Sequence, residues 1–488
     1  MAETIGNAGE YNIEELILIS ASGTETINLA HAVSEVNIWE SIYAPFITGK
    51  LALIDDVNYH NILPMVGQEI MKIKLSSPSM TTSEEVIQHI FYVHNIDSVS
   101  NINPNYDVVT LSFCSMEQII GQRKKVQRTL VGTWSDIITN IVRNDLESKK
   151  DLYMEPCSGS QRIVPTGDSP FNLIDDAKMQ AVSQKYGSPT FFFFETLNGI
   201  HFRSLESLYD NNLQGYYTAD QYSGLEIGDK GRINIAQEFS KMRKFARGSS
   251  NDTSEGQVSG TYASSIIEHD IFNKRYTTSG YNYFNSFDDE KHINEFHDKD
   301  TLPLYSAGAV DDNSGDVASY PVKEYLLPTS IKDINTGNDA TKVISAYAPG
   351  GNDKNQYPFK SYSPSSWLTR RTSTLGQLAN GIEIQFQVDG ETSIKCGDVV
   401  EVNLPKTAAN KDAEGDFLDK FVRGPFIILS LAHQFSAKSD SHNLIITCVK
   451  DCVDKVLDGS SDNPLPKIEY GTTKLNPRTF NKISDFYR

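Results

Sequence analysis

Short hydrophobic runs separated by turn-forming residues dominate the first part of the chain. Between residues 13 and 115, Asn, Gly, Ser and Pro interrupt the sequence at short intervals. Many short strands at this spacing are typical of a barrel or a sandwich, so we expect a β-barrel domain over residues 1–118. The runs expected to form strands are Leu16–Ile19, Phe46–Ile54, Ile70–Leu75, Phe91–Val93 and Val108–Phe113.

A helical period replaces this pattern after residue 119. Thr133 can cap a helix, and Asp136 occupies the box position three residues later. The residues that would form one apolar face are Trp134, Ile137, Ile138, Ile141 and Val142.

A second helix is predicted over residues 170–186, with Ser169 as N-cap, Pro170 at the first helical position and Gly187 at the end. We expect a β-hairpin after it, in which Asn198-Gly199 forms a type I′ turn between two strands. Those strands are Phe191–Leu197 and Ile200–Leu205. Residues 119–208 are therefore predicted to be an α+β segment.

Clear β alternation returns near the C-terminus. Residues Ile382–Val388 alternate strictly, as a half-buried strand does, and Asp389-Gly390 follows as a turn. We expect a second β-barrel domain over residues 381–452, for which strands from the irregular region 209–380 are candidates to complete the barrel. Further strands are predicted at Val399–Leu404, Phe426–Leu431 and Leu444–Val449.

The region 209–380 has no clear period. Gly248–Gly260 and Ser306–Ser319 have the composition of linkers, and the tyrosine-rich stretch Tyr276–Phe287 fits strands or ordered loops equally well. The polar tail, 453–488, is predicted to be an extended arm. The fold class expected is mainly β with an α+β insertion.

The two β regions share a faint pattern. Gly67-Gln68 precedes Ile70-x-x-Ile73-x-Leu75, and Gly397-Asp398 precedes Val400-x-Val402-x-Leu404. Each is followed by an aromatic-led strand and then by a strand that holds Val109-Thr110 or Ile446-Thr447. The match needs a slip of one residue, and alternating strands resemble one another by chance. The sequence therefore leaves both a duplicated barrel and a chance similarity open.

Composition restricts the class of protein. A chain of 488 residues suggests three or four domains, and its formal charge of −19 disfavours a surface that grips phosphates. The same charge would keep an assembly soluble or let an inner wall repel DNA. Five scattered cysteines indicate reduced thiols in a protein folded in a cytoplasm. No basic and apolar leader and no run of ~20 apolar residues is present, so we expect neither a cleavable signal nor membrane insertion.

Candidate chemistry is sparse. Adjacent residues on a helix point about 100° apart, so the carboxylates of Asp175 and Asp176 cannot face one substrate. We expect both to lie on a solvated helix surface. His89 and His94, like His292 and His297, are five residues apart, which is not metal-ligand spacing on a strand or a helix. His433 is expected to be structural. Cys448 and Cys452 have no second ligand pair, and Asp311–Asp316 lacks the Gly and Glu of a calcium loop. The one basic cluster, Arg123-Lys124-Lys125-x-x-Arg128, fits a solvated loop or an inter-subunit salt-bridge patch. No P-loop, G-x-S-x-G or dinucleotide motif occurs, so we predict no catalytic residue, metal or cofactor.

Four further segments have a distinctive order and spacing and together touch about half of the chain. They are Val36–Leu51 with Asp55 and Leu63–Gly67, Leu111–Ser115 with the helix at Trp134–Ile137, residues 169–208, and Cys396–Val402 with Phe426–His433. Together they resemble the baseplate central hub protein of contractile-tailed bacteriophages of the T-even type, which is related to the hub portion of type VI secretion spikes. Their order and spacing are more specific than any one segment.

The resemblance implies a homotrimer in which two similar barrels per chain form a ring with pseudo-sixfold symmetry. Such a structural hub would join a sixfold tail tube, or its initiator proteins, to a trimeric central spike. Baseplate wedge proteins would surround it, and DNA would pass through its channel without specific binding. The location implied is the virion tail baseplate, assembled in the host cytoplasm. The interface residues expected are Tyr43, Pro45, Phe46 and Gly49 in the first barrel, and Pro464, Tyr470, Phe480 and Phe486 in the arm.

Two other interpretations stay open. A tail-associated hydrolase or carbohydrate-binding module on a β scaffold would need two carboxylates facing across a cleft, roughly 5 to 9.5 Å apart for glycosidase chemistry. A type VI-like spike hub would share the fold, but no long fused spike repeat is present.

Overall fold

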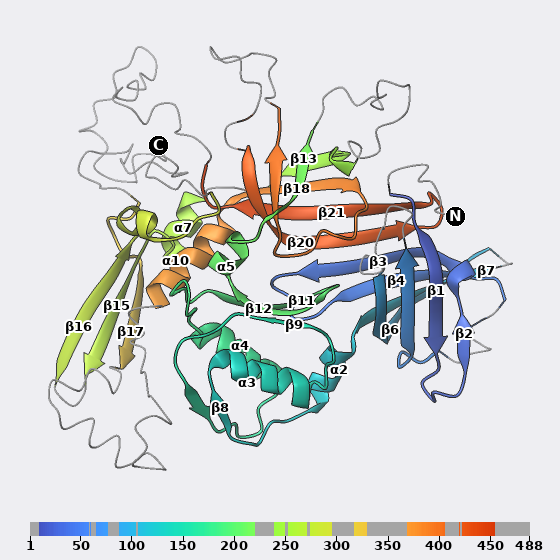
Figure 1. Cartoon of the computed structure of the whole chain (residues 1–488), viewed down its shortest axis with the longest axis horizontal. Coiled ribbons are helices and arrows are strands. Elements are labelled where there is room, and N and C mark those ends of the chain that lie inside the picture. The colour runs from blue at the N-terminus through green and yellow to red at the C-terminus, as the bar shows by residue number, and fades with distance from the viewer. Residues whose placement is uncertain are drawn as a thin grey trace, which may run out of the picture.

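The computed structural model describes residues 9–57, 59, 65–76, 87–103, 106–219, 239–248, 252–270, 274–294, 317–328, 368–405, 419 and 422–453 (Figure 1). The chain is mainly β, as the sequence predicts, and its described strands form one large sheet and three small ones. Residues 454–488 of the predicted arm lie outside the described residues, as do the stretch Asp311–Asp316 and most of Ser306–Ser319. None of the described helices is long and apolar enough to cross a membrane.

The first β region forms one half of the large sheet, in the order β3-β4-β7-β6-β5-β1-β2. Inward and outward positions alternate along these strands, which buries one face of each. We call this half the first module. Its elements are β1 (Asn12–Ile19), β2 (Thr26–Asn28), the short 3-10 helix η1 (Ala30–Ala32), β3 (Val33–Ser41), β4 (Thr48–Asp55), β5 (Ile70–Ser76), β6 (Ile87–Asn103) and β7 (Tyr106–Ser115).

The C-terminal β region forms the other half, which we call the second module. Its order is β14-β18-β21-β20, and the other edge of β20 carries β19 and then β13. Two strands from the irregular region 209–380, β13 and β14, therefore belong to this module. Its elements are β13 (Leu213–Thr218), β14 (Lys244–Arg247), β18 (Ile382–Asp389), β19 (Val399–Asn403), β20 (Gly424–Ser436) and β21 (Ser441–Lys450).

The expectation of two separate barrels is corrected by the way the modules meet. No described sheet closes on itself, and β20 continues past its predicted end to pair with β3. Because β20 is 13 residues long, its first half pairs with β19 and its second half with β3. The two modules therefore share one continuous sheet of 13 strands.

The α+β segment lies against the two modules (Figure 1). Thr133 and Asp136 form the predicted capping box, and Ser169 accepts a hydrogen bond from the Asn172 N–H. The elements are α2 (Met116–Arg123), β8 (Leu130–Gly132), α3 (Trp134–Asn140), the π-helical turn η2 (Ile141–Asp145), β9 (Leu152–Met154), β10 (Gln161–Ile163), α4 (Pro170–Gln180), β11 (Phe191–Thr196), β12 (Gly199–Ser204) and α5 (Leu205–Tyr209).

Two local predictions in this segment are wrong. The helix α4 ends at Gln180, because Ala181 is already extended, and Gly187 lies in a later turn at φ +64°. The hairpin turn is Leu197-Asn198, because Gly199 is the first residue of β12 and pairs with Thr196. Gly199 is needed there for a different reason: a Cβ would lie 2.4 Å from the Asp151 carbonyl oxygen.

The remaining described part of 209–380 forms a small sheet in the order β16-β15-β17, flanked by α7 and α10 (Figure 1). Part of the predicted linker is helical, because Asp252 caps α7 and Gly260 ends it at φ +83°. The tyrosine-rich stretch resolves into a strand and two short helical turns. The elements are α7 (Thr253–Ser259), β15 (Ala263–Asp270), β16 (Arg275–Asn282), α8 (Tyr283–Ser286), η3 (Phe287–Asp289), β17 (Lys323–Pro328) and α10 (Leu368–Ala379).

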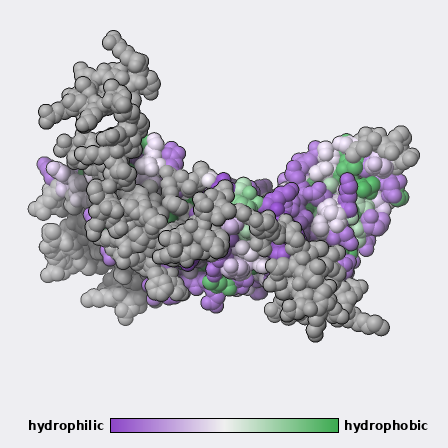
Figure 2. Space-filling model, turned by 90° about the horizontal axis from the view of Figure 1, so that it is seen from above, coloured by the Kyte–Doolittle hydropathy of each residue, from purple (hydrophilic) through white to green (hydrophobic). Residues whose placement is uncertain are grey.

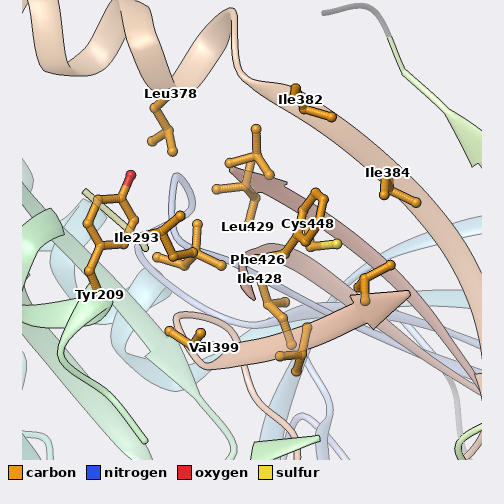
Figure 3. Close-up of a cluster of buried hydrophobic side chains, with 14 of the residues drawn as sticks. Tyr209, Ile293, Leu378, Ile382, Ile384, Val399, Phe426, Ile428, Leu429 and Cys448 are labelled. Carbon is orange, nitrogen blue, oxygen red and sulfur yellow. The ribbon is translucent and has the colours of Figure 1, made fainter. Parts of the chain in front are cut away.

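Three clusters of buried apolar side chains underlie these parts. One fills the first module, one lies between the helices and the β11–β12 hairpin, and the largest fills the second module. The largest brings together Leu378 of α10, Tyr209 of α5, and Phe426 and Ile428 of β20 (Figure 3). The domain boundaries expected from the sequence stay a prediction.

Candidate subunit interface

The two modules repeat the same strand order. The first reads β3-β4-β7-β6-β5-β1 and the second reads β14-β18-β21-β20-β19-β13. Within each module, neighbouring strands are antiparallel, with one exception at the last pair. In the first module β1 is antiparallel to β5, whereas in the second β13 is parallel to β19. The strand order therefore repeats as the faint sequence pattern indicates, although Val109-Thr110 is equivalent to Leu444-Ile445 and not to Ile446-Thr447.

The turns before β5 and β19 explain the one-residue slip. Gly67 and Gly397 both have positive φ, +77° and +84°. The Val93 N–H donates to the Glu69 carbonyl at 2.8 Å, and the Ile428 N–H donates to the Asp398 carbonyl at 2.9 Å. Glu69 is therefore equivalent to Asp398, and the first turn contains one extra residue.

The next strands keep the same register. Phe91 pairs with Met71 in the first module, and Phe426 pairs with Val400 in the second. Each strand then carries a bulge at an equivalent place, between Val93 and Asn95 in β6 and between Ile428 and Ser430 in β20. Bulges bend and twist a strand, so the two modules bend their sheets at the same point.

The seam between the modules is the pairing of β3 with β20. Ser430–Ser436 pairs with Ser41–Glu35, and hydrogen bonds from the Ile42 N–H to Leu429 and from the Ala437 N–H to Ser34, both 3.0 Å, flank the paired stretch. Phe435 reaches across the seam into the core of the first module, where its ring lies 5.2 Å from that of Tyr11.

The repeat predicts a second seam, and neither of its two edges has a partner among the described strands. The strand equivalent to β3 is β14, which ends the sheet and is exposed along its length. The stretch equivalent to the second half of β20 is Asn95–Asn103 of β6, beyond the last residue that pairs with β5. No described strand pairs with either edge.

The loop between β3 and β4 contains the predicted interface residues of the first module. Tyr43 is 55% exposed and Pro45 is also exposed, whereas Phe46 and Gly49 are buried within the chain. Phe46 packs at 5.7 Å from the ring of Phe171, and a Cβ on Gly49 would lie 2.2 Å from Phe113. Phe46 and Gly49 therefore serve internal packing, while Tyr43 and Pro45 are accessible to a partner. The interface role of all four of these residues stays a prediction. The arm residues predicted for the interface, Pro464, Tyr470, Phe480 and Phe486, lie outside the described residues.

The same loop joins all three apolar cores. Ile42 belongs to the core of the second module, Phe46 to that of the α+β segment and Ile47 to that of the first module. Three neighbouring side chains thus fix the relative position of three parts of the fold.

Two buried carboxylates hold this junction. Glu40 accepts hydrogen bonds from the Leu197 N–H at 2.7 Å and the Cys396 N–H at 3.2 Å. Glu195 accepts from the Ile47 N–H at 3.1 Å and pairs with Lys150 at 2.5 Å. Burial raises the pKa of Glu40 to about 7. Sequence reasoning missed both residues, although Glu40 falls on the inward face of an alternating strand, a position that is costly for a carboxylate.

The buried histidines are structural. His433 Nδ1 lies 3.0 Å from His442 Nε2, and burial lowers the pKa of His433 to about 3. His292 is paired instead with Asp451 at 2.8 Å, which raises its pKa. His433 is thus held inside the second module, as the sequence indicates.

The remaining candidates have ordinary surroundings. Asp175 and Asp176 are exposed on α4, and all five cysteines are buried free thiols. In the basic cluster, Lys124 pairs with Glu147, and Arg128 pairs with Asp145 at 2.6 Å within the same chain. No group of three potential metal ligands occurs among the described residues.

The described surface is mixed in character. Seen from above, it is largely polar, with small hydrophobic patches on the lobe formed by the first module (Figure 2). Ile90 and Val99 of β6, and Phe245 of β14, are among the large apolar side chains that are about half exposed.

Comparison with solved structures finds matches to phage tail proteins. The 43 kDa tail protein of prophage MuSo2 from Shewanella oneidensis matches with a TM-score of 0.48 at 10% identity, over 90% of this chain and 99% of that one. A tail protein from Neisseria meningitidis MC58 matches with a TM-score of 0.46 at 8% identity, over 91% and 97%. The prophage tail protein gp18 from Listeria monocytogenes EGD-e gives 0.43 at 9% identity, over 91% and 95%. These are distant likenesses. No family model and no curated protein matches the sequence.

Proposed function

We propose that this protein is a structural component of a phage tail baseplate, the hub that joins the tail tube to the central spike. The observation that carries the proposal is the repeat of strand order, turn and bulge between the two modules. A chain with two similar modules can present six similar surfaces from three copies. That is the geometry needed to match a sixfold tube on one side and a threefold spike on the other.

The proposed assembly is a homotrimeric ring in the virion tail baseplate, formed in the host cytoplasm. Its modules would face the tube or tube-initiator proteins, its other side would bind the spike, and wedge proteins would surround it. DNA would pass through the channel without specific binding. The sequence resemblance over four ordered segments supports these partners.

The contacts of the buried carboxylates also agree with a structural role. Glu40 and Glu195 are each bound by backbone N–H groups or lysine within the fold, and Glu155 accepts from the Ser204 N–H at 2.6 Å. Groups engaged in this way hold elements together. The alternative of a hydrolase or a carbohydrate-binding module gains no support from them.

The oligomeric state tests the proposal. Native mass spectrometry of the full chain should show three copies, and class averages from electron microscopy should show a ring with six similar lobes. Mixing with purified tail tube and spike should give a complex in which the tube and the spike occupy opposite faces. A chain that stays monomeric at micromolar concentration in the presence of both partners would overturn the hub assignment.

A further inference from the structure

We propose that β14 of one copy pairs antiparallel with the second half of β6 of a second copy, in the register that β3 and β20 use within the chain. This inference rests on the proposed ring and specifies the contact that closes it. The inference follows from the repeat. One seam, β3 with β20, is formed within the chain, whereas the equivalent strand edges, on β14 and on the second half of β6, have no partner among the described strands.

The register follows from equivalent pairs. Val93 and Ile428 are equivalent, because each is the last residue before the shared bulge. Val93 pairs with Phe113, and Ile428 pairs with Cys448, so Phe113 and Cys448 are equivalent. Their partners on the other side, Gly49 and Ile384, are therefore equivalent as well. Gly49 also pairs with Ile38 of β3, and Ile384 pairs with Arg247 of β14. Arg247 is therefore equivalent to Ile38.

The same reasoning applies to the receiving strand. In β20, His433 pairs with Leu444 on one side and Ile38 on the other. In β6, a further bulge between Ile96 and Ser98, which β20 lacks, adds one residue, and Val99 then holds the corresponding place, opposite Val109 of β7. The predicted inter-chain pairs are therefore Val99 with Arg247 and Ser100 with Ala246.

The direction of the backbone groups on β14 agrees with this pairing. The Gly248 N–H donates to the Glu383 carbonyl at 3.0 Å, so residues 244, 246 and 248 form the hydrogen-bonded pairs with β18. Phe245 and Arg247 then direct their N–H and C=O groups to the open edge. In β3 the equivalent residues are Val36 and Ile38. The Ile42 N–H donates to the Leu429 carbonyl of β20, and every second residue of a strand faces the same neighbour, so Val36 and Ile38 also direct their N–H and C=O groups to β20.

The side chains at the two edges are compatible. Phe245 and Val99 are 48% and 54% exposed, so pairing of the edges would cover apolar surface. β14 carries Lys244 and Arg247, whereas the open stretch of β6 has a single charged residue, Asp97. No like charges would therefore face each other across the contact.

This contact is heterologous, because each copy donates β14 and receives at β6. Repeating a heterologous contact gives either a closed ring or an open filament, and closure leaves no such edge unpaired. Unpaired strand edges are sites of aggregation, so the ring removes a hazard that the isolated chain carries.

Cysteine cross-linking tests the register. Ser100 and Ala246 are both exposed, and as a non-hydrogen-bonded pair their Cα atoms would lie about 4.5 Å apart, within the range of a disulfide. A ring reassembled from a mixture of Ser100→Cys and Ala246→Cys chains should form an inter-chain disulfide on mild oxidation. The native cysteines are buried and should contribute little background.

Two control mixtures define the specificity. Ser98→Cys with Ala246→Cys is displaced by two residues and should cross-link at least tenfold more slowly. Ser439→Cys with Ala246→Cys places one thiol on the exposed β20–β21 turn and should give no cross-link. Equal cross-linking in all three mixtures would overturn the register.

A backbone variant separates this inference from the ring itself. Arg247→Pro removes an outward N–H but none of the bonds to β18, and it should abolish assembly while the monomer keeps its circular dichroism spectrum. Arg247→Ala loses the ion pair with Asp419 but keeps the N–H, and it should still assemble. A trimeric ring that forms with Arg247→Pro and gives no Ser100–Ala246 cross-link would overturn the seam and leave the hub intact. A wild-type chain that is monomeric would overturn both.

Discussion

Glu40 shows how one buried side chain can join distant parts of this fold. It lies on β3 in the first module, yet it binds the tip of the β11–β12 hairpin and the turn before β19. The carboxylate is almost completely shielded from solvent, so its charged form is disfavoured and its pKa rises to about 7. Its contribution to stability must therefore depend on pH near neutrality.

We predict that this dependence has a definite sign. The folded-state pKa lies above the unfolded value, so the stabilisation from protonated Glu40 is complete below about pH 4.5 and is lost as pH rises through 7. The loss should be on the order of 3 kcal/mol. Denaturant unfolding of wild type and Glu40→Gln across pH 4.5–8 measures it: the difference between the two should change with pH. A constant difference would contradict the prediction.

Gly49 gives a second prediction at this scale. A Cβ there would lie 2.2 Å from Phe113 and 2.4 Å from the Asn37 carbonyl oxygen, so Gly49→Ala should destabilise the first module by about 1–3 kcal/mol. Gly280→Ala is the matched control, because the nearest atom to its Cβ lies at 3.8 Å. Thermal unfolding of both variants checks the contrast, and equal melting temperatures would contradict it.

At the scale of elements, local signals on the sequence predicted most strands and both main helix starts. The capping box at Thr133 and the N-cap at Ser169 were readable because they depend on residues within one turn. The end of α4 and the hairpin turn were not, because the close approach of Asp151 to Gly199 is a tertiary contact. The pairing of β20 with β3 was invisible for the same reason: it joins residues about 400 positions apart.

The candidate interface was predicted only in part. The repeat was detectable as a pattern of glycines and alternating strands, but the extra residue in the first turn obscured its register. The open edges could not be found from sequence, since an edge is defined by the strand that is absent beside it. Burial of Phe46 and Gly49 likewise depends on neighbours supplied by distant segments.

Phe435 provides a test of the seam between the modules. Its ring comes from β20 but packs in the first core against Tyr11, so Phe435→Ala should cost about 3–5 kcal/mol in unfolding free energy. Tyr276→Ala serves as control, because that side chain is 74% exposed and its loss should change stability by less than about 0.5 kcal/mol. A similar small effect at Phe435 would show that the seam depends on its backbone bonds alone.

At the scale of the whole molecule, the charge of −19 bears on how the proposed ring would treat DNA. Acidic walls repel phosphates, so we predict that the assembled ring does not retain duplex DNA even at about 50 mM salt, where basic binders hold it most tightly. Fluorescence anisotropy of a labelled duplex measures this. Binding that weakens steeply as salt rises would indicate a basic lumen and remove the idea of a repelling wall.

The continuous sheet has a mechanical consequence. Because β3 and β20 are hydrogen bonded side by side, a pull that slides one module past the other loads all of their backbone bonds at once, in shear. Side-chain contacts alone would yield one after another. A chain joined in this way can transmit an axial force from one module to the other without the two modules separating, as the proposed hub would require.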